Sequence, residues 1–446
     1  MSRFLLATWD GGGTIPPELG LAAELVDRGH EVVVLSDDTV EREAVDAGAT
    51  FIPWQRAPQA RARDTERALI RDWEVRNPLA QVRQVGQLLF FGPASLHAAD
   101  LADAIDACSP DVLIVDALLT GASAGAEHSG LPTAAVAPNV NMLRTTGVPP
   151  MGSGLQPLDN RVGRMRDAAL HRLNDVLMGT GTLNDTRREL GLVPVGSLEE
   201  SVRRAHRVIF LTSEAFDFTP TTPDPAVVYG GLPIPPNERS PLDWTPPWAD
   251  DGRPAVLLSL STTYMQQEDL LQRLVEALGR VDCHALVTTG AGMRARPLAV
   301  VPSNVHVVES APHGAVLPHV DLVITHGGHG TVTRSLAAGV PVMVVPISRD
   351  QPDNAARVVH HEVGIKVSKR SSPNKYATAV RRVLADGAIR ANARAMAERL
   401  APDVGAPKAI AALEELASGD GGRRVQELRE PNGQRLHRDA HVDRRS

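Results

Sequence analysis

The chain has 446 residues, enough for two or three domains. Its 43% hydrophobic and 22% charged residues are typical of a globular protein and exclude a disordered or fibrous chain. The net charge of -7 argues against nucleic acid as a partner. No apolar run is long enough to predict a transmembrane segment, and two distant cysteines, Cys108 and Cys283, exclude a disulfide scaffold. With a short N-terminal apolar run, these features favour a cytoplasmic protein.

The first part of the chain alternates apolar strands with helices. Residues 3–8 and 32–35 are short apolar runs typical of buried strands, and residues 16–28 carry apolar side chains at helical spacing. A glycine loop at 11–13 separates the first strand from this helix, and residues 112–115 predict a further strand. Such units build a parallel sheet covered by helices. We therefore expect an α/β domain over residues 1–215.

The segments around this domain's end are less regular. Residues 56–107 have the charge and apolar spacing of helices, whereas residues 142–163 are rich in glycine and proline and predict a loop that borders an opening. Prolines crowd the segment 216–250. This density predicts a linker without regular elements.

The strand and helix rhythm returns after residue 250. The predicted strands are 255–260, 285–288, 305–308, 322–325 and 340–345. The predicted helices are 268–278, 376–385 and 390–400. We expect a second α/β domain over residues 251–400, then a helix at 401–417 that returns to the first domain, and a disordered tail at 418–446.

A glycine-rich segment carries the clearest chemical signal. Residues 325–331 read THGGHGT at a predicted turn from a strand into a helix. Glycines there let the backbone approach a ligand, and the free N–H groups at a helix start favour an anion such as phosphate. His326 and Thr331 add hydrogen-bond donors. The alternative is that the glycines only make a tight turn.

The wider segment 326–358 resembles the signature of GT-B nucleotide-sugar glycosyltransferases, closest to the bacterial natural-product members of the UDP-glucuronosyl/UDP-glucosyl superfamily. Weaker similarities are SLST at 259–262 and GGLP at 230–233. The resemblance implies two Rossmann-like domains facing across a cleft, an acceptor-binding first domain and a donor-binding second one. It implies no cofactor beyond the nucleotide-sugar co-substrate and no metal. The acidic pairs 37–38 and 250–251 are accordingly expected to be solvated loop residues.

The resemblance also assigns roles to residues of the donor site. In the family, the histidine and small residues of the glycine-rich loop hold the diphosphate, and here these are His326, Gly328, Gly330 and Thr331. Ser261 and Thr262 either add hydroxyl donors to the diphosphate or simply cap a strand end. The family's Asp-Gln pair, which binds hydroxyls of the sugar, is Asp350 and Gln351. Asp350 can alternatively cap a helix, whereas Gln351 has no such alternative role.

Two departures from the family concern the nucleotide. An acidic residue used toward the ribose is common in the family where this chain has Arg334, and a guanidinium cannot accept from ribose hydroxyls. An aromatic residue that stacks on the base is also common, whereas residues 310–313 read SAPH. Base recognition is therefore expected to depend more on backbone groups.

A third departure concerns the general base. The histidine that the family uses as base in the first loop is Thr14 here, and a threonine cannot accept a proton at neutral pH. The acid that usually orients this histidine is retained as Asp116. Asp116 and then Asp10 are the catalytic candidates, and we expect Asp116 to face the acceptor. The alternative for each is a loop-capping aspartate.

The sequence therefore predicts an inverting, metal-independent glycosyltransferase. It would move a sugar from UDP or dTDP to a small, apolar natural-product acceptor such as a polyketide or macrolide, in a secondary-metabolism or antibiotic pathway. One alternative is a GT-B sugar-nucleotide epimerase. The other is a non-catalytic nucleotide-sugar-binding auxiliary protein, which the loss of the histidine at Thr14 would permit.

Overall fold

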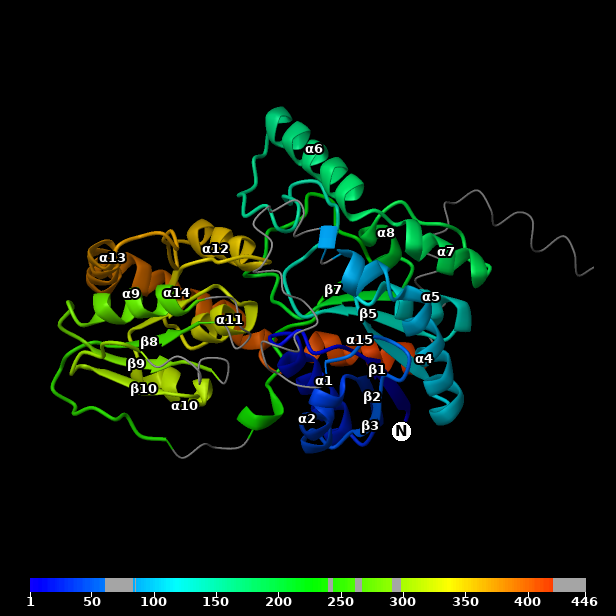
Figure 1. Ribbon diagram of the computed structural model, residues 1–446, viewed down its shortest axis with the longest axis horizontal. Helices are drawn as coiled ribbons and strands as arrows, with labels where there is room; N and C mark the ends of the chain where they lie inside the picture. Colours follow the sequence, from blue (N-terminus) through cyan, green and yellow to red (C-terminus); the bar gives the residue numbers. More distant parts are fainter. Residues whose placement is uncertain (61–82, 85, 240–243, 261–266, 291–297, 420–446) are drawn as a thin grey trace, which may run out of the picture.

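The computed structural model of the chain describes all residues except 61–82, 85, 240–243, 261–266, 291–297 and 420–446. Two helix-covered parallel sheets lie side by side, one in each half of the chain (Figure 1). This arrangement confirms the predicted α/β fold with two Rossmann-like domains. The candidates Ser261 and Thr262, and the tail from residue 420, lie outside the described residues. No helix in the described ranges is long and apolar enough to cross a membrane.

The first sheet has the strand order β3-β2-β1-β4-β5-β6-β7, with parallel neighbours throughout. Its strands are β1 (Arg3–Ala7), β2 (Glu31–Ser36), β3 (Thr50–Pro53), β4 (Val112–Asp116), β5 (Thr133–Ala137), β6 (Arg207–Phe210) and β7 (Val227–Tyr229). The helices of this half are α1 (Ile15–Asp27), α2 (Glu41–Asp46), α4 (Ala94–Cys108), α5 (Thr120–Ser129), α6 (Arg161–Met178), α7 (Gly181–Glu189) and α8 (Leu198–Val202).

The second sheet has the order β10-β9-β8-β11-β12-β13, again all parallel. Its strands are β8 (Ala255–Ser259), β9 (His284–Thr288), β10 (Val305–Val308), β11 (Leu322–Thr325), β12 (Val342–Val344) and β13 (Gly364–Lys366). The helices that follow the linker are α9 (Glu268–Leu278), α10 (His313–Val316), α11 (His329–Ala337), α12 (Gln351–His360), α13 (Pro373–Ala385), α14 (Gly387–Leu400) and α15 (Pro407–Ala417).

Each sheet is buried on both faces, which explains why its strands read as continuous apolar runs. In β1, Phe4 and Leu6 pack with α1 and α15, whereas Leu5 and Ala7 pack with α4 and α5 on the other face. Successive side chains of a strand point to opposite faces, so an unbroken apolar run covers both. In the second sheet, β8 alternates in the same way between α9 and α13 on one face and α11 and α14 on the other.

The chain passes between the two halves twice, once after β7 and once before α15, and these two segments lie side by side. The Leu232 N–H donates to the carbonyl oxygen of Asp403 (2.7 Å), and the Gly405 N–H donates to the carbonyl oxygen of Leu232 (2.9 Å). After this crossing α15 packs beside α1, where Ile410 and Leu413 join the core of the first sheet (Figure 1).

The structure corrects the sequence prediction in two irregular stretches. Residues 216–250 were expected to hold no regular element, yet Val227–Tyr229 form β7, which pairs with β6 at the edge of the first sheet. The prolines flank these three residues and leave their N–H groups free to pair. Of the predicted helical stretch 56–107, the described residues 56–60 are irregular, and the preceding strand β3 was not predicted.

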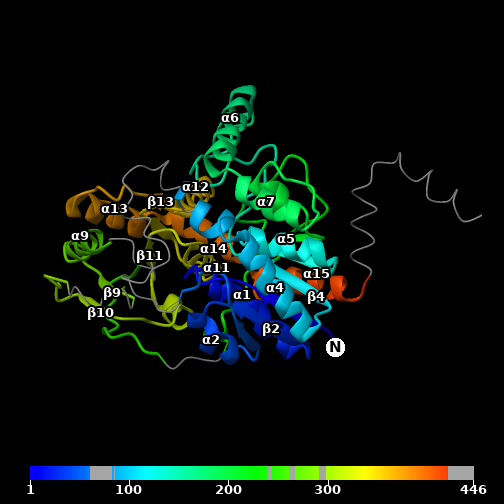
Figure 2. The same cartoon turned by 45° about the vertical axis from the view of Figure 1, so that its right-hand side comes forward.

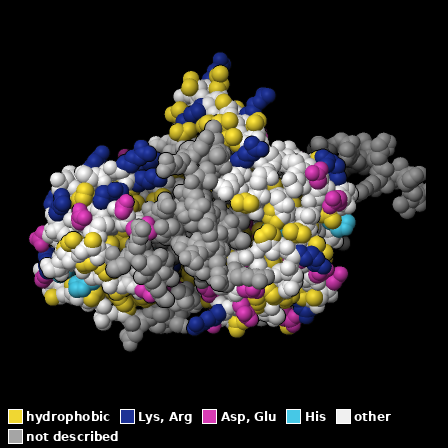
Figure 3. All heavy atoms as spheres, in the orientation of Figure 1, with side chains coloured by type: hydrophobic (Ala, Val, Ile, Leu, Met, Phe, Trp, Pro, Cys, Tyr) yellow, Lys and Arg dark blue, Asp and Glu magenta, His cyan; other side chains and the backbone are white. Residues whose placement is uncertain are grey.

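Helix α6 stands clear of both sheets in two views (Figures 1 and 2). It begins at the end of the predicted loop, where the Asn160 Oδ1 accepts the Gly163 N–H (2.9 Å) as an N-cap. Val162, Met165 and Val176 are exposed along it, among basic side chains (Figure 3).

Candidate functional site

The strand order of each sheet reverses at one point. In open parallel sheets, ligands bind outside the carboxyl ends of the strands at such a point. In the first sheet it lies between β1 and β4, where Trp9 and Asp10 follow β1 and Asp116 ends β4. In the second sheet it lies between β8 and β11, where Ser259 ends β8 and His326 follows β11. The fold thus brings the predicted residues of both halves to the ligand-binding edge of their sheets.

The glycine-rich turn between β11 and α11 has a backbone that a larger side chain would disturb. Gly327 has a φ of 100°, a left-handed conformation that favours glycine. Gly328 is the N-cap of α11, and a Cβ there would lie 2.8 Å from the Nε2 of His326. The two residues that precede α11, Gly327 and Gly328, therefore place no side chain over the start of the helix. The first N–H groups of a helix and its dipole favour an anion, so the site remains a prediction that this geometry allows.

His326 presents a neutral imidazole beside this helix start. The residue keeps partial exposure, but enclosure of its ring and the charge of Arg349 lower its pKa to about 4. A neutral imidazole at physiological pH offers one N–H donor to an anion. Gly330 and Thr331 are partly exposed in the first turn of α11, as a diphosphate contact requires.

Asn354, which sequence analysis did not single out as a site residue, holds the turn in place. Its Nδ2 donates to the carbonyl oxygen of Gly327 and to Asp350 Oδ2, both at 3.0 Å. Its Oδ1 lies 3.0 Å from the Nδ1 of His329, whose Nε2 lies 3.2 Å from the carbonyl oxygen of Leu211 in the first half. Asp350 stands at the N-cap position of α12, but its side chain makes no capping bond. Its carboxylate accepts from Asn354 instead.

Gln351 has a structural role that the sequence prediction denied it. Its side chain is buried, and its Oε1 accepts the backbone N–H groups of Ile347 (2.8 Å) and Ser348 (3.0 Å). The side-chain oxygen therefore shapes the loop between β12 and α12. This is a correction to the expectation that Gln351 has no role besides sugar binding.

Arg334 is paired with a carboxylate. Its Nη1 donates to Glu238 Oε1 in an ion pair, and its Nε donates to the carbonyl oxygen of Gly330 (3.0 Å). Glu238 comes from a 3-10 turn (Pro236–Glu238) of the segment that joins the two halves. The family often carries an acid at the position of Arg334. In this chain an acid, Glu238, instead lies beside that position and pairs with Arg334. Burial, and then the charge of Arg334, also lower the pKa of His313 to about 3.

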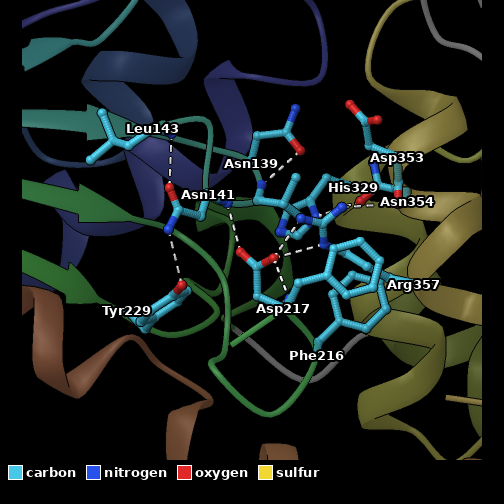
Figure 4. A network of polar contacts seen from close by, with 12 residues as sticks. Asn139, Asn141, Leu143, Phe216, Asp217, Tyr229, His329, Asp353, Asn354 and Arg357 are labelled. Carbon is cyan, nitrogen blue, oxygen red and sulfur yellow. Dashed lines mark hydrogen bonds and ion pairs between the residues drawn. The ribbon is translucent and has the colours of Figure 1, made fainter. Parts of the chain in front are cut away.

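A buried ion pair joins α12 to the first half of the chain (Figure 4). The Nε and Nη2 of Arg357 donate to Asp217 Oδ1 at 2.7 and 2.6 Å, and the two side chains are 4% and 0% exposed. Asp217 Oδ2 accepts the N–H of Asn141 (2.6 Å), whose side chain donates to the Tyr229 hydroxyl (3.1 Å). The helix that carries Asp350 and the sheet of the other half are therefore linked by a charged, buried contact.

The glycine- and proline-rich loop 142–160 is anchored to the same helix. Asp353 Oδ2 accepts the N–H of Gly152 (2.5 Å) and its Oδ1 accepts that of Gly154 (2.8 Å). Burial raises the pKa of Asp353 to about 6, although these two N–H groups oppose the shift. The loop expected to border an opening thus contacts the N-terminal turn of the predicted sugar-binding helix.

Asp10 and Thr14 shape the first loop. The Asp10 carboxylate accepts the N–H of Gly12 (3.1 Å) and the hydroxyl of Thr39 (2.6 Å). Thr14 stands at the N-cap position of α1 without a capping bond, and its hydroxyl lies 3.4 Å from the carbonyl oxygen of Trp9. Asp10 therefore has the loop-capping contacts that were the alternative to a catalytic role.

Asp116 forms a buried carboxyl pair with Glu18, a residue absent from the sequence prediction. Both side chains are fully buried. Asp116 Oδ1 accepts the N–H of Leu118 (2.7 Å), and the Thr8 hydroxyl donates to Glu18 Oε2. Burial and then the charge of Asp116 raise the pKa of Glu18 well above its usual range. A protonated Glu18 can donate to Asp116, which satisfies two carboxyl oxygens that otherwise lack a donor among the described residues.

A cavity of ≈ 140 Å³ opens at the carboxyl ends of the strands of the first sheet. It is lined by Trp9, Asp37, Trp54, Pro58, Leu88, Phe90, Pro93, His97 and Leu119. The first three of these follow β1, β2 and β3, and Leu119 follows β4. Asp116 is not among its described lining residues, so the expectation that Asp116 faces the acceptor finds no support in this conformation.

Two titratable side chains stand out in this apolar cavity. Asp37 is 2% exposed, and burial raises its pKa to about 6. His97 packs edge-on against Trp54 with ring centroids 5.0 Å apart, and burial lowers its pKa to about 4. Its Nδ1 is buried without a hydrogen-bond partner among the described residues.

Sequence reasoning missed these groups because their signal is weak in one dimension. Asp37 was treated as part of a solvated pair, and a histidine within a helix shows no special spacing. Only its place directly after a strand, like that of Asp116, could have marked Asp37 as a residue of the ligand-binding edge. In the described ranges, no group of three or more His, Cys, Asp and Glu side chains could hold a metal ion.

Comparison with known proteins places the chain among glycosyltransferases. Residues 272–416 match the family described as "Erythromycin biosynthesis protein CIII-like, C-terminal domain". The chain is 30% identical over 414 residues to the 4'-demethylrebeccamycin synthase of Lentzea aerocolonigenes, an alignment that covers 90% of this chain and 96% of that protein.

Solved structures share the whole fold. The glycosyltransferase of kitacinnamycin is similar with a TM-score of 0.72 at 22% identity, covering 93% of this chain and 99% of that one. The glycosyltransferase VinC, solved in complex with dTDP, is similar with a TM-score of 0.67 at 21% identity, covering 94% and 100%. By its sequence similarity over nearly its whole length, together with this shared fold, the chain belongs to the GT-B glycosyltransferases of natural-product pathways.

Proposed function

We propose that this chain transfers a sugar from UDP or dTDP to a small apolar acceptor that carries an aromatic ring, with inversion at the anomeric carbon. The observation that carries the proposal is the cavity lined by Trp9, Trp54 and Phe90 in one half, with an anion-binding helix start in the other. In this proposal the first half binds the acceptor and the second half binds the donor.

The donor half is suited to a nucleoside diphosphate. The N-terminus of α11, the neutral imidazole of His326 and the hydroxyl of Thr331 offer N–H and O–H donors to the phosphates. These donors would also stabilise the negative charge that grows on the diphosphate as it leaves. Asp350 and Gln351 lie at the start of α12 and are proposed to contact the sugar hydroxyls.

The acceptor half is suited to a flat, apolar group. A cavity of ≈ 140 Å³ is close to the roughly 150 Å³ of an engineered protein cavity that binds benzene, so it accommodates about one aromatic ring. Tryptophan and phenylalanine rings favour offset or edge-on contacts with such a group. The similarity to 4'-demethylrebeccamycin synthase supports a natural-product acceptor, and we propose that an aromatic ring of this acceptor enters the cavity.

We propose that the two substrates, held in opposite halves, react by a single in-line displacement. An acceptor held by the first sheet attacks the anomeric carbon from the side away from the diphosphate held by the second. A single in-line displacement of this kind inverts the configuration.

The test is product formation from paired libraries. We would incubate the protein with UDP-sugars and dTDP-sugars and with aromatic, macrolide and aliphatic acceptors, and identify products by mass spectrometry and the anomeric configuration by NMR. Transfer to aromatic acceptors supports the proposal. Transfer only to aliphatic or macrolide acceptors would refute the acceptor class, and donor turnover without transfer to any acceptor would refute the activity.

A further inference from the structure

Asp37 has a position that no other carboxylate in the described first half shares. It follows β2 directly, one strand away from the point between β1 and β4 where the strand order reverses, and it is the carboxylate that lines the aromatic cavity. Its Oδ2 accepts the N–H of Asp10 (2.5 Å) and its Oδ1 accepts the N–H of Ala60 (2.6 Å). A carboxylate offers about four lone-pair directions, so the backbone contacts leave it able to accept from a ligand in the cavity.

We propose that Asp37 is the general base that replaces the histidine missing at Thr14, and that it takes the proton from a hydroxyl or N–H group on the acceptor's aromatic ring. This inference rests on the proposed function, because it needs an acceptor ring in the cavity. Asp37 then touches the reacting group, whereas Asp116 is fully buried beside Glu18 and is not among the described residues that line the cavity.

The proposed step balances without a metal or an added reagent. The acceptor's O–H or N–H bond breaks and its proton passes to Asp37, while the acceptor atom forms a bond to the anomeric carbon. The bond from the anomeric carbon to the diphosphate oxygen breaks, and its electron pair leaves with the diphosphate. Asp37 afterwards releases the proton to solvent, which restores the carboxylate.

The surroundings of Asp37 suit it to this task. Burial is the largest cause of its raised pKa, and the two backbone N–H groups and the nearby charge of Asp10 act in opposite directions on it. A base with a pKa of about 6 is ionised at neutral pH yet basic enough to accept a proton from a phenol-type group in the transition state. The other titratable groups nearby are His97, across the cavity on α4, and Asp38, which is exposed.

The roles of Asp10 and Asp116 differ in this reading. Asp10 supports Asp37 directly, because its backbone N–H donates to the carboxylate while its own side chain caps the loop. Asp116 and Glu18 join β4 to α1. Both positions are expected to matter for structure. Burial also raises the pKa of Asp116 to about 6, so an Asp116 variant is needed to separate its titration from that of Asp37.

The experiment compares Asp37→Asn with two matched variants. Asp38→Asn removes the same charge one residue away from an exposed side chain that has no hydrogen bond among the described residues. Asp116→Asn tests the carboxylate that the sequence prediction favoured. For each protein we would measure kcat/KM from pH 5 to 9 with a simple phenolic acceptor, and donor affinity by calorimetry.

For the wild type and Asp38→Asn, we expect kcat/KM to rise with pH and to level off above about pH 6, where Asp37 is ionised. For Asp37→Asn, we expect a fall of about 100-fold or more at pH 8, with no rise near pH 6 and unchanged donor affinity. A pH profile of Asp37→Asn that keeps the wild-type rise, or loss of that rise in Asp116→Asn alone, would overturn the proposal.

A second acceptor serves as a control that the Asp37→Asn variant is correctly folded. A nitrophenol that is already ionised at the assay pH needs no base, so Asp37→Asn should glycosylate it at close to the wild-type rate. If Asp37→Asn lost transfer to both acceptors but kept its donor affinity, a role limited to proton transfer would be contradicted.

If the wild type transferred no sugar to any acceptor, the proposed function would fail instead. The contact between Asp37 and the acceptor ring would then be tested by phenol binding, measured through the fluorescence of the tryptophans that line the cavity. Binding that changes near pH 6 in the wild type but not in Asp37→Asn would support the contact, and identical binding in both would exclude it.

Discussion

Replacing His97 with phenylalanine should make the protein less sensitive to acid. His97 lies in the cavity of the first half, where its ring packs edge-on against Trp54 and its Nδ1 is buried without a partner among the described residues. Phenylalanine keeps a ring at this contact and removes the two nitrogens. The variant therefore removes a group that protonates in the unfolded chain and resists protonation in the folded one.

The size of the effect follows from the pKa. Burial lowers the pKa of His97 from 6.5 to about 4, and the nearby Asp100 opposes the shift. Between these values the unfolded chain binds more protons, so the stability contributed by His97 is complete above about pH 6.5 and is lost as the pH falls toward 4. At 1.36 kcal/mol per pH unit the full loss of stability is about 3 kcal/mol, of which about 2 kcal/mol has already been lost at pH 5.

The assay is urea-induced unfolding of the wild type and His97→Phe at pH 8 and at pH 5. We expect the variant to gain about 2 kcal/mol over the wild type on going from pH 8 to pH 5, because every other titrating group is common to both proteins. His128→Phe, which changes an exposed histidine, should show no such gain. A difference between wild type and His97→Phe that is the same at both pH values would refute the reasoning.

Four further outcomes test the site. His326→Ala should weaken binding of UDP or dTDP by about 2 kcal/mol, since a hydrogen bond to a charged diphosphate is lost; unchanged affinity by calorimetry would reject this role. Gln351→Ala should lower the stability by about 1–3 kcal/mol because two partly buried N–H groups lose their acceptor, and Gln351→Glu, which keeps an acceptor oxygen, should recover most of it in thermal unfolding. Asp217→Asn should destabilise the protein by about 3–5 kcal/mol, because the buried Arg357 loses its counter-charge; a change below 1 kcal/mol in urea unfolding would mean that the pair is hydrated. Activity should survive EDTA, since protein N–H and O–H donors meet the diphosphate, and a strict requirement for Mg²⁺ would contradict that assignment.

The sequence alone determined the features that depend on neighbours along the chain. Runs of apolar residues such as those in β1 and β8 identify buried parallel strands, because a strand covered on both faces has no polar side. The turn at 326–328 was readable because glycine is the residue that tolerates its backbone. The two doubly wound halves, and the position at which an anion site is predicted, follow from these local rules.

Tertiary structure decided what depends on partners from distant segments. Gln351 turned out to shape a loop, and Arg334 to pair with Glu238, because the fold supplies an acceptor or a charge that sequence spacing does not reveal. Asp116 has the expected place at the end of a strand, yet Glu18 from α1 encloses it.

Asp37 shows most clearly the difference between what the local sequence predicts and what distant segments of the fold determine. Its sequence context is an ordinary acidic pair after a strand, in which Asp38 is exposed to solvent as expected. Asp37 differs because Trp9, Trp54 and α4, each from a different part of the chain, exclude water around it. Exclusion of water raises the pKa of a carboxyl group, and that burial exists only when the separate elements have packed together.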